Sequence, residues 1–132
     1  MRSLRPSRTA LVLTLFAGAA LLAAAAFARP SNKWRIECSE GAKSDGVLVF
    51  HLQPEGGSLQ VIEVTVARGT GENAVARRIR DVFREQLPPE RYHVEVDDGE
   101  DVLVKKKRDT PDFDLRLESN TVKAVRIHLD RE

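Results

Sequence analysis

The sequence predicts an α+β domain in which an antiparallel sheet of six to seven strands carries one amphipathic helix packed on a face. Two observations lead to this fold class. Apolar and polar residues alternate over most of the chain after residue 28, which is the period of half-buried strands. The period changes once, over residues 75–87, to the spacing of a helix. Because strands are expected on both sides of that helix, the predicted order is β-β-β-α-β-β-β-β.

Three strands are expected before the helix. The first covers about residues 33–38, where every second residue is apolar. A nearly continuous apolar run at 47–52 is typical of a central strand. The third strand covers 59–67, and the segment 53–58, with one proline and two glycines, joins it to the second strand as a hairpin.

The single predicted helix has an apolar stripe at positions i, i+4, i+7, i+8 and i+12. The stripe consists of Val75, Ile79, Val82, Phe83 and Leu87. Thr70 is the expected N-cap, and Glu72 is favourably placed in the first turn. Pro88 and Pro89 end the helix, because the residue before a proline avoids the α region and proline has no N–H to donate.

Four strands are expected after the helix, over 91–96, 101–107, 112–118 and 122–130. The first two are predicted to form a hairpin whose three-residue loop ends at Gly99 in the left-handed conformation. In this register Val94 lies opposite Val102. Tyr92 then lies opposite Val104, so the apolar faces of the two strands come together.

The last two strands are predicted to form a second hairpin, with its turn centred on Thr121. This register matches three apolar pairs, namely Leu117 with Val125, Leu115 with Ile127, and Phe113 with Leu129. A slip of one residue would turn one apolar face to water, which favours this pairing.

The first 28 residues are predicted to be a secretory signal peptide. Three arginines and no acid in the first nine residues precede an apolar run over 10–26, and a small-x-small triplet follows at 26–28. Cleavage would leave one small domain, residues 29–132, in the periplasm or outside the cell, with no stable membrane insertion. The alternative is an uncleaved membrane anchor, for which the apolar run is slightly short.

The charge of the mature domain differs from that of the whole chain, which carries 21 basic and 20 acidic residues. Because the signal peptide contains three of the arginines and no acid, the mature domain has 18 basic and 20 acidic residues, a formal charge of −2. A nearly neutral domain has no overall attraction for nucleic acid or anionic membranes. Nucleic acid is therefore not expected as a partner.

Cys38 is the only cysteine of the chain, so no internal disulfide can form. It shares a strand face with Trp34 and Ile36, and a buried cysteine behaves as a small hydrophobe. We expect Cys38 to point into the core. The alternative is a reactive or intermolecular thiol, which would require exposure and a lowered pKa.

Catalytic and metal-binding motifs are not recognisable in the sequence, which has no Gly-x-Ser-x-Gly, no His-Glu-x-x-His and no pair of cysteines. We therefore expect no enzyme activity, no cofactor and no metal. One alternative remains open. His93, Glu95 and Asp97 share one face of a predicted strand and would form a metal or hydrolase site, especially if His128 came near. An exposed polar strand face also accounts for these three residues.

Two basic clusters are candidates for a binding surface. Arg77, Arg80 and Arg84 lie on the helix, and Lys105 and Lys107 lie in the last part of a strand. Each cluster is suited to an anionic ligand, such as lipopolysaccharide or phosphate, or to an acidic partner. Ordinary ion pairs with interleaved acids are the alternative for the helix. Protection of an exposed sheet edge is the alternative for the lysines.

A series of short motifs lies between residues 64 and 105. They are Val64-Thr65-Val66, Gly69-Thr70, Val75-Ala76, Ile79, Tyr92-His93-Val94-Glu95-Val96, Asp98-Gly99 and Val102-Leu103-Val104. In these residues the stretch resembles small modules of phage tail and flagellar hook-associated proteins. The shared plan is a hairpin, an amphipathic helix and a second hairpin. The resemblance implies an assembly or decoration module without catalytic residues.

Together these observations predict a small exported, non-enzymatic domain that serves as a binding or structural accessory protein of the cell envelope. Its partner would be an envelope or extracellular protein or an anionic ligand. One alternative is an inhibitor or assembly module that adds a strand to a partner through an exposed sheet edge. The other is a small hydrolase or metal-binding protein that uses His93, Glu95 and Asp97.

Overall fold

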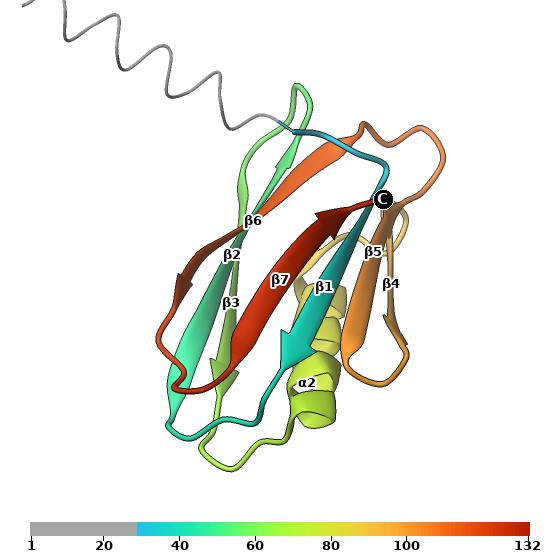
Figure 1. The fold of residues 1–132 in the computed structure, drawn as a ribbon. Helices are drawn as coiled ribbons and strands as arrows, with labels where there is room; N and C mark the ends of the chain where they lie inside the picture. The colour runs from blue at the N-terminus through green and yellow to red at the C-terminus, as the bar shows by residue number, and fades with distance from the viewer. Residues whose placement is uncertain (1–28) are drawn as a thin grey trace, which may run out of the picture.

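The computed structural model describes residues 29–132, so the predicted signal peptide lies outside the described residues. In chain order the elements are β1 (Lys33–Ser39), β2 (Gly46–Pro54), β3 (Gln60–Val66), α2 (Glu72–Gln86), β4 (Tyr92–Asp97), β5 (Asp101–Lys106), β6 (Phe113–Asn120) and β7 (Arg126–Arg131) (Figure 1). All strand pairs are antiparallel. The predicted α+β class and the predicted order of elements are confirmed. Within 29–132, the one helix is too short and too polar to span a membrane.

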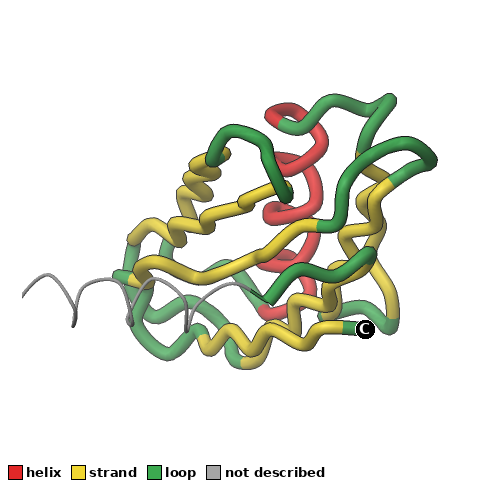
Figure 2. Tube along the Cα trace, turned by 90° about the horizontal axis from the view of Figure 1, so that it is seen from above, coloured by secondary structure: helices red, strands yellow, loops and turns green. Residues whose placement is uncertain are grey.

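The seven strands form two sheets, with the orders β4-β5-β1-β7 and β3-β2-β6. Strands β6 and β7 contact each other where the sheets meet, but they do not pair. Helix α2 contacts β3 and β4, the strands at the far ends of the two sheets. The helix therefore packs between the outer strands of the two sheets. Figure 2 shows it flanked by both sheets.

The core lies between the two sheets and the helix. All five residues of the predicted helical stripe are buried, which confirms the stripe. Within it, the Phe83 ring packs edge-on against Phe50 of β2 with centroids 5.2 Å apart. The ring of Tyr92 packs in the same way against Phe113 at 5.4 Å, and the Trp34 indole N–H donates a 2.8 Å hydrogen bond to the Phe113 carbonyl. The first contact joins the helix to the three-stranded sheet, and the other two join the two sheets to each other.

The start of the helix differs from the sequence-based expectation. The N-cap is Gly71, and it provides no side-chain hydrogen bond. The hydroxyl of Thr70, the predicted cap, donates instead to the carbonyl of Ala67 at 2.6 Å. The carbonyl of Thr70 accepts from the N–H of Ala42 at 2.8 Å. Because both groups are used in the loop before the helix, Thr70 cannot cap it, whereas Glu72 lies in the first turn as predicted.

The hairpin of β2 and β3 is confirmed, with Leu52 opposite Gln60 and Gly46 opposite Val66. Strand β2 also pairs with β6 on its other side. The apolar run at 47–52 is therefore the central strand of its sheet, as predicted.

The hairpin of β4 and β5 also forms, but its predicted register is wrong by two residues. Val94 lies opposite Val104, and Val96 lies opposite Val102. Side chains alternate with a period of two, so a shift of two residues leaves both apolar faces together and apolar matching cannot detect it. The loop decides the register, because Asp98 and Gly99 both adopt positive φ, at 48° and 78°.

The predicted hairpin centred on Thr121 is wrong, because β6 pairs with β2 and β7 pairs with β1. The chain after β6 is bound to the start of β2 instead. The Thr121 N–H donates to the Val47 carbonyl at 3.1 Å, and the Val47 N–H donates to the Thr121 hydroxyl at 2.9 Å. A Cβ atom at Gly46 would lie 2.8 Å from the Thr121 backbone, so this approach requires glycine. The contact turns β6 away from β7.

Candidate functional site

Two arginines of α2 bind the outer strands of the two sheets. Arg78 donates from Nε to the Thr65 carbonyl of β3 at 3.1 Å and from Nη2 to the Thr65 hydroxyl at 3.0 Å. Arg84 donates from Nε to the Val94 carbonyl of β4 at 2.8 Å. A charged donor makes a stronger hydrogen bond than a neutral one. Part of the arginine cluster on the helix therefore holds the helix between the sheet edges. The sequence carries no signal for this role, since two of the three acceptors are backbone carbonyls and the third is the hydroxyl of Thr65, which is distant in the sequence.

A hollow of about 340 Å³ lies beside the Arg84 contact, and we call it the α2–β4 hollow. It is lined by Phe83, Arg84, Leu87, Pro89, Tyr92, His93, Val94 and Lys107. Its floor is formed by Phe83, Leu87 and Tyr92, whose apolar and aromatic side chains belong to the core. Arg84 and Lys107 provide cationic groups, His93 provides an imidazole, and none of the eight described residues that line it is acidic. The arrangement suits an anionic group attached to an apolar one.

The structure brings together two of the five predicted basic residues. Arg84 and Lys107 line the α2–β4 hollow, although they come from the helix and from the segment after β5. Arg80 pairs with its neighbour Asp81 at 2.9 Å, and the exposed Arg77 is outside the lining. Lys105 lies 3.5 Å from a carboxylate oxygen of Glu95. Because β5 pairs on both sides, the interpretation of the lysines as protection of an edge strand is wrong for Lys105.

The floor of the hollow was not singled out as a functional feature by the sequence. Phe83 and Leu87 belong to the helical stripe, and Tyr92 was expected to face the core. Burial raises the pKa of the Tyr92 phenol above its ordinary value. Tyr92 is therefore a neutral, largely apolar part of the floor at physiological pH.

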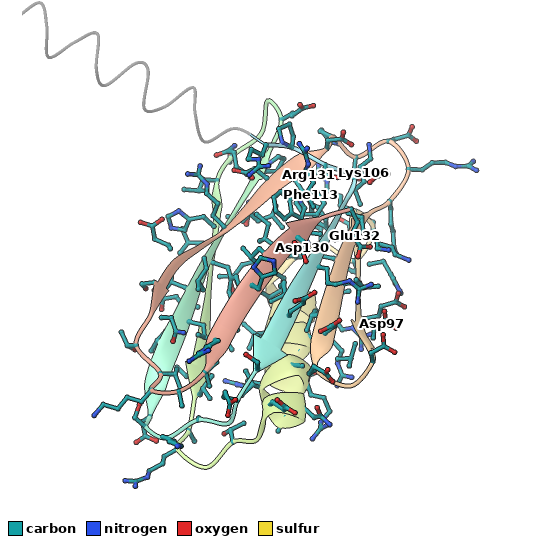
Figure 3. The ribbon with its side chains drawn as sticks, in the orientation of Figure 1. Asp97, Lys106, Phe113, Asp130, Arg131 and Glu132 are labelled. Carbon is teal, nitrogen blue, oxygen red and sulfur yellow. The ribbon has the colours of Figure 1, made fainter. Side chains whose placement is uncertain are left out.

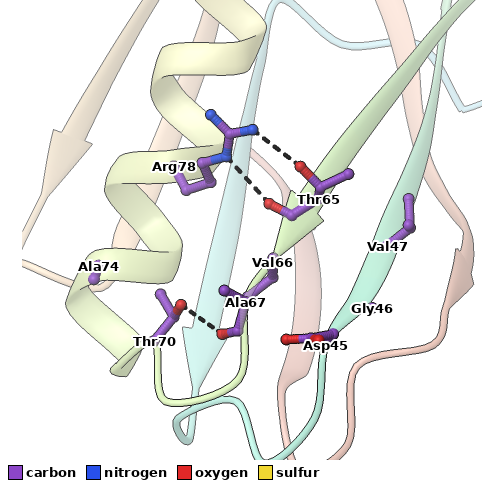
Figure 4. A pocket seen from close by; sticks show the side chains of 9 residues that line it. All are labelled: Asp45, Gly46, Val47, Thr65, Val66, Ala67, Thr70, Ala74 and Arg78. Atoms are coloured by element: carbon purple, nitrogen blue, oxygen red, sulfur yellow. Dashed lines mark hydrogen bonds between the residues drawn. The ribbon is translucent and has the colours of Figure 1, made fainter.

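A larger and more open hollow, of about 820 Å³, lies at the other end of the helix (Figure 4). Its polar side chains are already hydrogen-bonded within the protein. Arg78 is bound to Thr65, Thr70 is bound to Ala67, and Asp45 accepts from the backbone N–H of Arg68 at 2.7 Å. Because Asp45 and Arg78 carry opposite charges, this hollow offers less preference for an anion than the α2–β4 hollow does.

The outer face of the four-stranded sheet carries an ordered network of charges around Arg35 of β1. The Arg35 guanidinium reaches Asp101 at 2.8 Å and Asp97 at 3.1 Å through Nη1, and Glu132 at 2.6 Å through Nε. These hydrogen bonds raise the pKa of Arg35 above its usual value, and the bond to Glu132 contributes most to this change. Leu103, which faces Arg35 across the strands, is buried beneath the charges. Asp97, Asp101 and Glu132 are therefore paired with Arg35 within the protein.

The three residues of the predicted metal face do not form a ligand group. His93 Nε2 lies 3.1 Å from Glu95 Oε2, but Asp97 pairs with Arg35 instead. Lys105 faces His93 from the neighbouring strand and occupies the position where a further ligand would be needed. Figure 3 shows Asp97 and Asp130 on opposite edges of the sheet, and His128 lies on β7 with Asp130. His128, which would have supported a metal site at the His93 face, is therefore not near it.

Cys38 is 2 % exposed and its thiol is free, so the prediction that it points inward is confirmed. Burial, followed by the nearby charges of Asp101 and Glu100, raises the pKa of the thiol to about 12. A protonated, buried thiol is a poor nucleophile and a poor metal ligand. Cys38 therefore acts as a core residue.

Comparison with known proteins finds no matching family model, no matching curated protein and no matching solved structure. The resemblance of residues 64–105 to phage tail and flagellar hook-associated modules stays a prediction.

Proposed function

We propose that this domain is an exported, non-enzymatic binding module that holds an anionic amphiphile, with its charged group at the rim of the α2–β4 hollow and its apolar part on the floor. The observation that carries the proposal is the lining of that hollow. Cationic groups from Arg84 and Lys107 meet over a buried apolar floor, and no carboxylate among the lining residues competes with the ligand. Its volume of about 340 Å³ lies near the lower end of the range of small-molecule sites, which is about 300–1,000 Å³.

The fixed position of Arg84 supports the proposal. Its hydrogen bond to the Val94 carbonyl uses Nε, so the N–H groups on the two terminal nitrogens are not part of this contact. A side chain that is already anchored loses little conformational entropy when a ligand binds. Paired N–H groups of a guanidinium match the oxygens of a carboxylate or phosphate. Arg84 is therefore suited to recognise the charged group, with Lys107 as a second cation.

The state of the nucleophilic and basic groups supports a role without catalysis. The Cys38 thiol is buried and its pKa is raised. The three histidines of the chain each lie beside a carboxylate on a strand surface, namely Glu118 for His51, Glu95 for His93 and Asp130 for His128. A neighbouring carboxylate can orient a catalytic histidine, but activation also requires a nucleophile within hydrogen-bond reach, and the contacts described for these histidines are to carboxylates.

The proposal is tested by calorimetric titration of the purified protein with octyl phosphate, octanol and inorganic phosphate. Octyl phosphate should bind at least tenfold more tightly than either of the others, because only it uses both the cationic rim and the apolar floor. Lys107→Glu should weaken octyl phosphate binding about tenfold, which corresponds to about 1.4 kcal/mol. Lys123→Glu makes the same charge change at an exposed loop position and should leave binding unchanged.

Equal affinity of Lys107→Glu and the unmodified protein for octyl phosphate would contradict the proposed site. Equal affinity for octyl phosphate and inorganic phosphate would show that the apolar floor has no role. In the first case the binding module would need another surface, and in the second the ligand would be a simple anion and not an amphiphile.

Export from the cytoplasm is a separate part of the proposal and rests on residues 1–28 of the sequence. Mass spectrometry of the protein recovered from outside the cytoplasm should find Arg29 as its first residue. An intact Met1 would indicate that the segment is retained as an anchor.

Strand addition is a second candidate function, and one observation favours it. Leu59 and Val61, at the start of the edge strand β3, are the large apolar residues that are exposed in the described part of the chain, at 46 % and 50 %. An exposed apolar edge is suited to pairing with an extended segment of a partner. The contact of Arg78 with Thr65 occupies the other half of β3. Val61→Lys should abolish binding of a partner that uses this edge and leave octyl phosphate binding unchanged.

A further inference from the structure

A group of potential metal ligands lies on β1 and β7, at the edge of the four-stranded sheet that is remote from the helix. Glu37 of β1 and His128 of β7 face each other in the register of the two strands. Asp130 lies two residues beyond His128 and therefore on the same strand face. One nitrogen or oxygen atom from each of the three side chains lies within 4.8 Å of the others. We call these three residues the β7 cluster.

The donor atoms of the β7 cluster suit a particular class of ion. Imidazole nitrogen and carboxylate oxygen are both ligand types that zinc accepts, and three protein ligands leave a position for water. Ligand atoms about 2.1 Å from a tetrahedral ion lie about 3.4 Å apart. His128 Nε2 and Asp130 Oδ1 are already 2.9 Å apart. The ligand atom of Glu37 lies within 4.8 Å of both, so it would have to move closer by about 1.4 Å at most.

The charges around the β7 cluster also favour a cation. Arg35 faces Asp130 across the strands, but its guanidinium is bound to Asp97, Asp101 and Glu132. Arg126, two residues before His128 on the same strand face, is a basic residue beside the β7 cluster. Glu37, Glu100 and Asp101 line the same hollow, so acidic residues outnumber basic ones there. Two like charges at short distance repel each other, and a divalent cation removes that repulsion.

The β7 cluster is accessible from solvent. Glu37 and His128 contribute to the lining of an open hollow of about 490 Å³, so water can reach an ion bound there. Figure 3 shows Asp130 on the outer side of β7. The hollow also borders Cys38, but the thiol has a pKa raised to about 12 and belongs to the core.

We propose that Glu37, His128 and Asp130 bind one divalent transition-metal ion of the zinc class, with water completing its coordination. The site is separate from the α2–β4 hollow, since the two share no residue and lie at opposite edges of the sheet. The imidazole distinguishes it from a calcium site, because calcium prefers oxygen ligands and a larger number of them.

The test is a calorimetric titration of the full-length protein, freed of metal with a chelator, with zinc chloride. One equivalent of zinc should bind. Glu37→Gln and His128→Ala should each reduce the affinity at least tenfold. The matched variants Glu95→Gln and His93→Ala change the equivalent pair on β4 and should leave the affinity unchanged.

The proposal would be overturned if the protein did not bind zinc, or if it bound calcium in preference to zinc. It would also be overturned if the β4 variants lost as much affinity as Glu37→Gln and His128→Ala. A second measurement on the unmodified protein does not depend on the folding of any variant. Cobalt chloride should broaden the amide resonances of 126–130 and of Glu37 and leave those of β4 sharp. Broadening centred on β4 would place the ion at His93 and overturn the assignment.

Discussion

The two edges of the four-stranded sheet carry the same short motif in different surroundings. On β4, His93 and Glu95 lie 3.1 Å apart, and on β7, His128 and Asp130 lie 2.9 Å apart. The neighbouring strand distinguishes them. Lys105 of β5 faces His93, whereas an acid of β1 faces His128. We infer that a histidine two residues from an acid is not a site in itself, and that the charge of the residue facing it across the strands favours or disfavours a cation.

The surroundings of the two edges also differ, because the helix packs against β4 and not against β7. Strand β4 lies against α2, and Arg84 and Lys107 make that side cationic over an apolar floor. Strand β7 lies next to β6 and away from the helix, and its outer face carries the β7 cluster. The two proposed sites thus have opposite chemistry, with an anion expected at β4 and a cation expected at β7.

The largest effect is expected from Glu37→Lys, which gives β7 the arrangement found at β4. Zinc affinity should fall at least a hundredfold, or about 2.7 kcal/mol, because a ligand is lost and a positive charge faces His128. Calorimetry measures the change, and the thermal midpoint without metal is the control for folding. A fall of less than tenfold would mean that Glu37 is not a ligand.

The reverse substitution, Lys105→Glu, places an acid opposite His93. The number of zinc ions bound per chain should rise from one to two, with the new site weaker than the β7 cluster because Asp97 remains paired with Arg35. The stoichiometry from calorimetry checks this result. Addition of His93→Ala to Lys105→Glu should restore a single site, and two sites in that double variant would contradict the comparison.

A smaller effect is expected from Arg84→Met, which keeps the apolar stem of the side chain and removes the donor to Val94. The free energy of unfolding should fall by about 1–2 kcal/mol, since a partly buried carbonyl loses its charged hydrogen-bond donor. Urea denaturation measures the loss. Arg77→Met is the matched control on the same helix, and an equal loss there would mean that the contact with β4 contributes nothing specific.

Sequence patterns predict this fold where the pattern is local. The helical stripe from Val75 to Leu87 depends on spacing within one element, and every member is buried. The register of β4 and β5 was wrong because a shift of two residues preserves both apolar faces. The separation of β6 from β7 depends on the approach of Gly46 to Thr121, which are distant in the sequence and have no pattern that links them.

The same limit applies to the candidate sites. Basic residues at Arg84 and Lys107 were predicted as a binding surface from their charge, but their meeting at one hollow depends on how the helix lies against β4. The predicted metal face joined residues of one strand and ignored the strand beside it. Glu37 and His128 come together only because β1 pairs with β7, and that pairing replaced the predicted hairpin of β6 with β7.

The smallest effect concerns the Glu95 carboxyl on β4. A hydrogen bond from His93 and the charge of Lys105 hold the pKa of Glu95 below its usual value. His93→Ala should raise that pKa towards 4.5, and a carbon-detected NMR titration of the side-chain carboxyl measures it. A carboxyl whose pKa is lower in the folded state stabilises the fold above its unfolded pKa, and this stability is lost as the pH falls through the folded pKa. The unmodified protein should therefore lose slightly more stability than His93→Ala on acidification below about pH 4.5. An unchanged Glu95 pKa in His93→Ala would mean that the two side chains are neighbours without being coupled, and the β4 pair would then be a poor reference for the pair on β7.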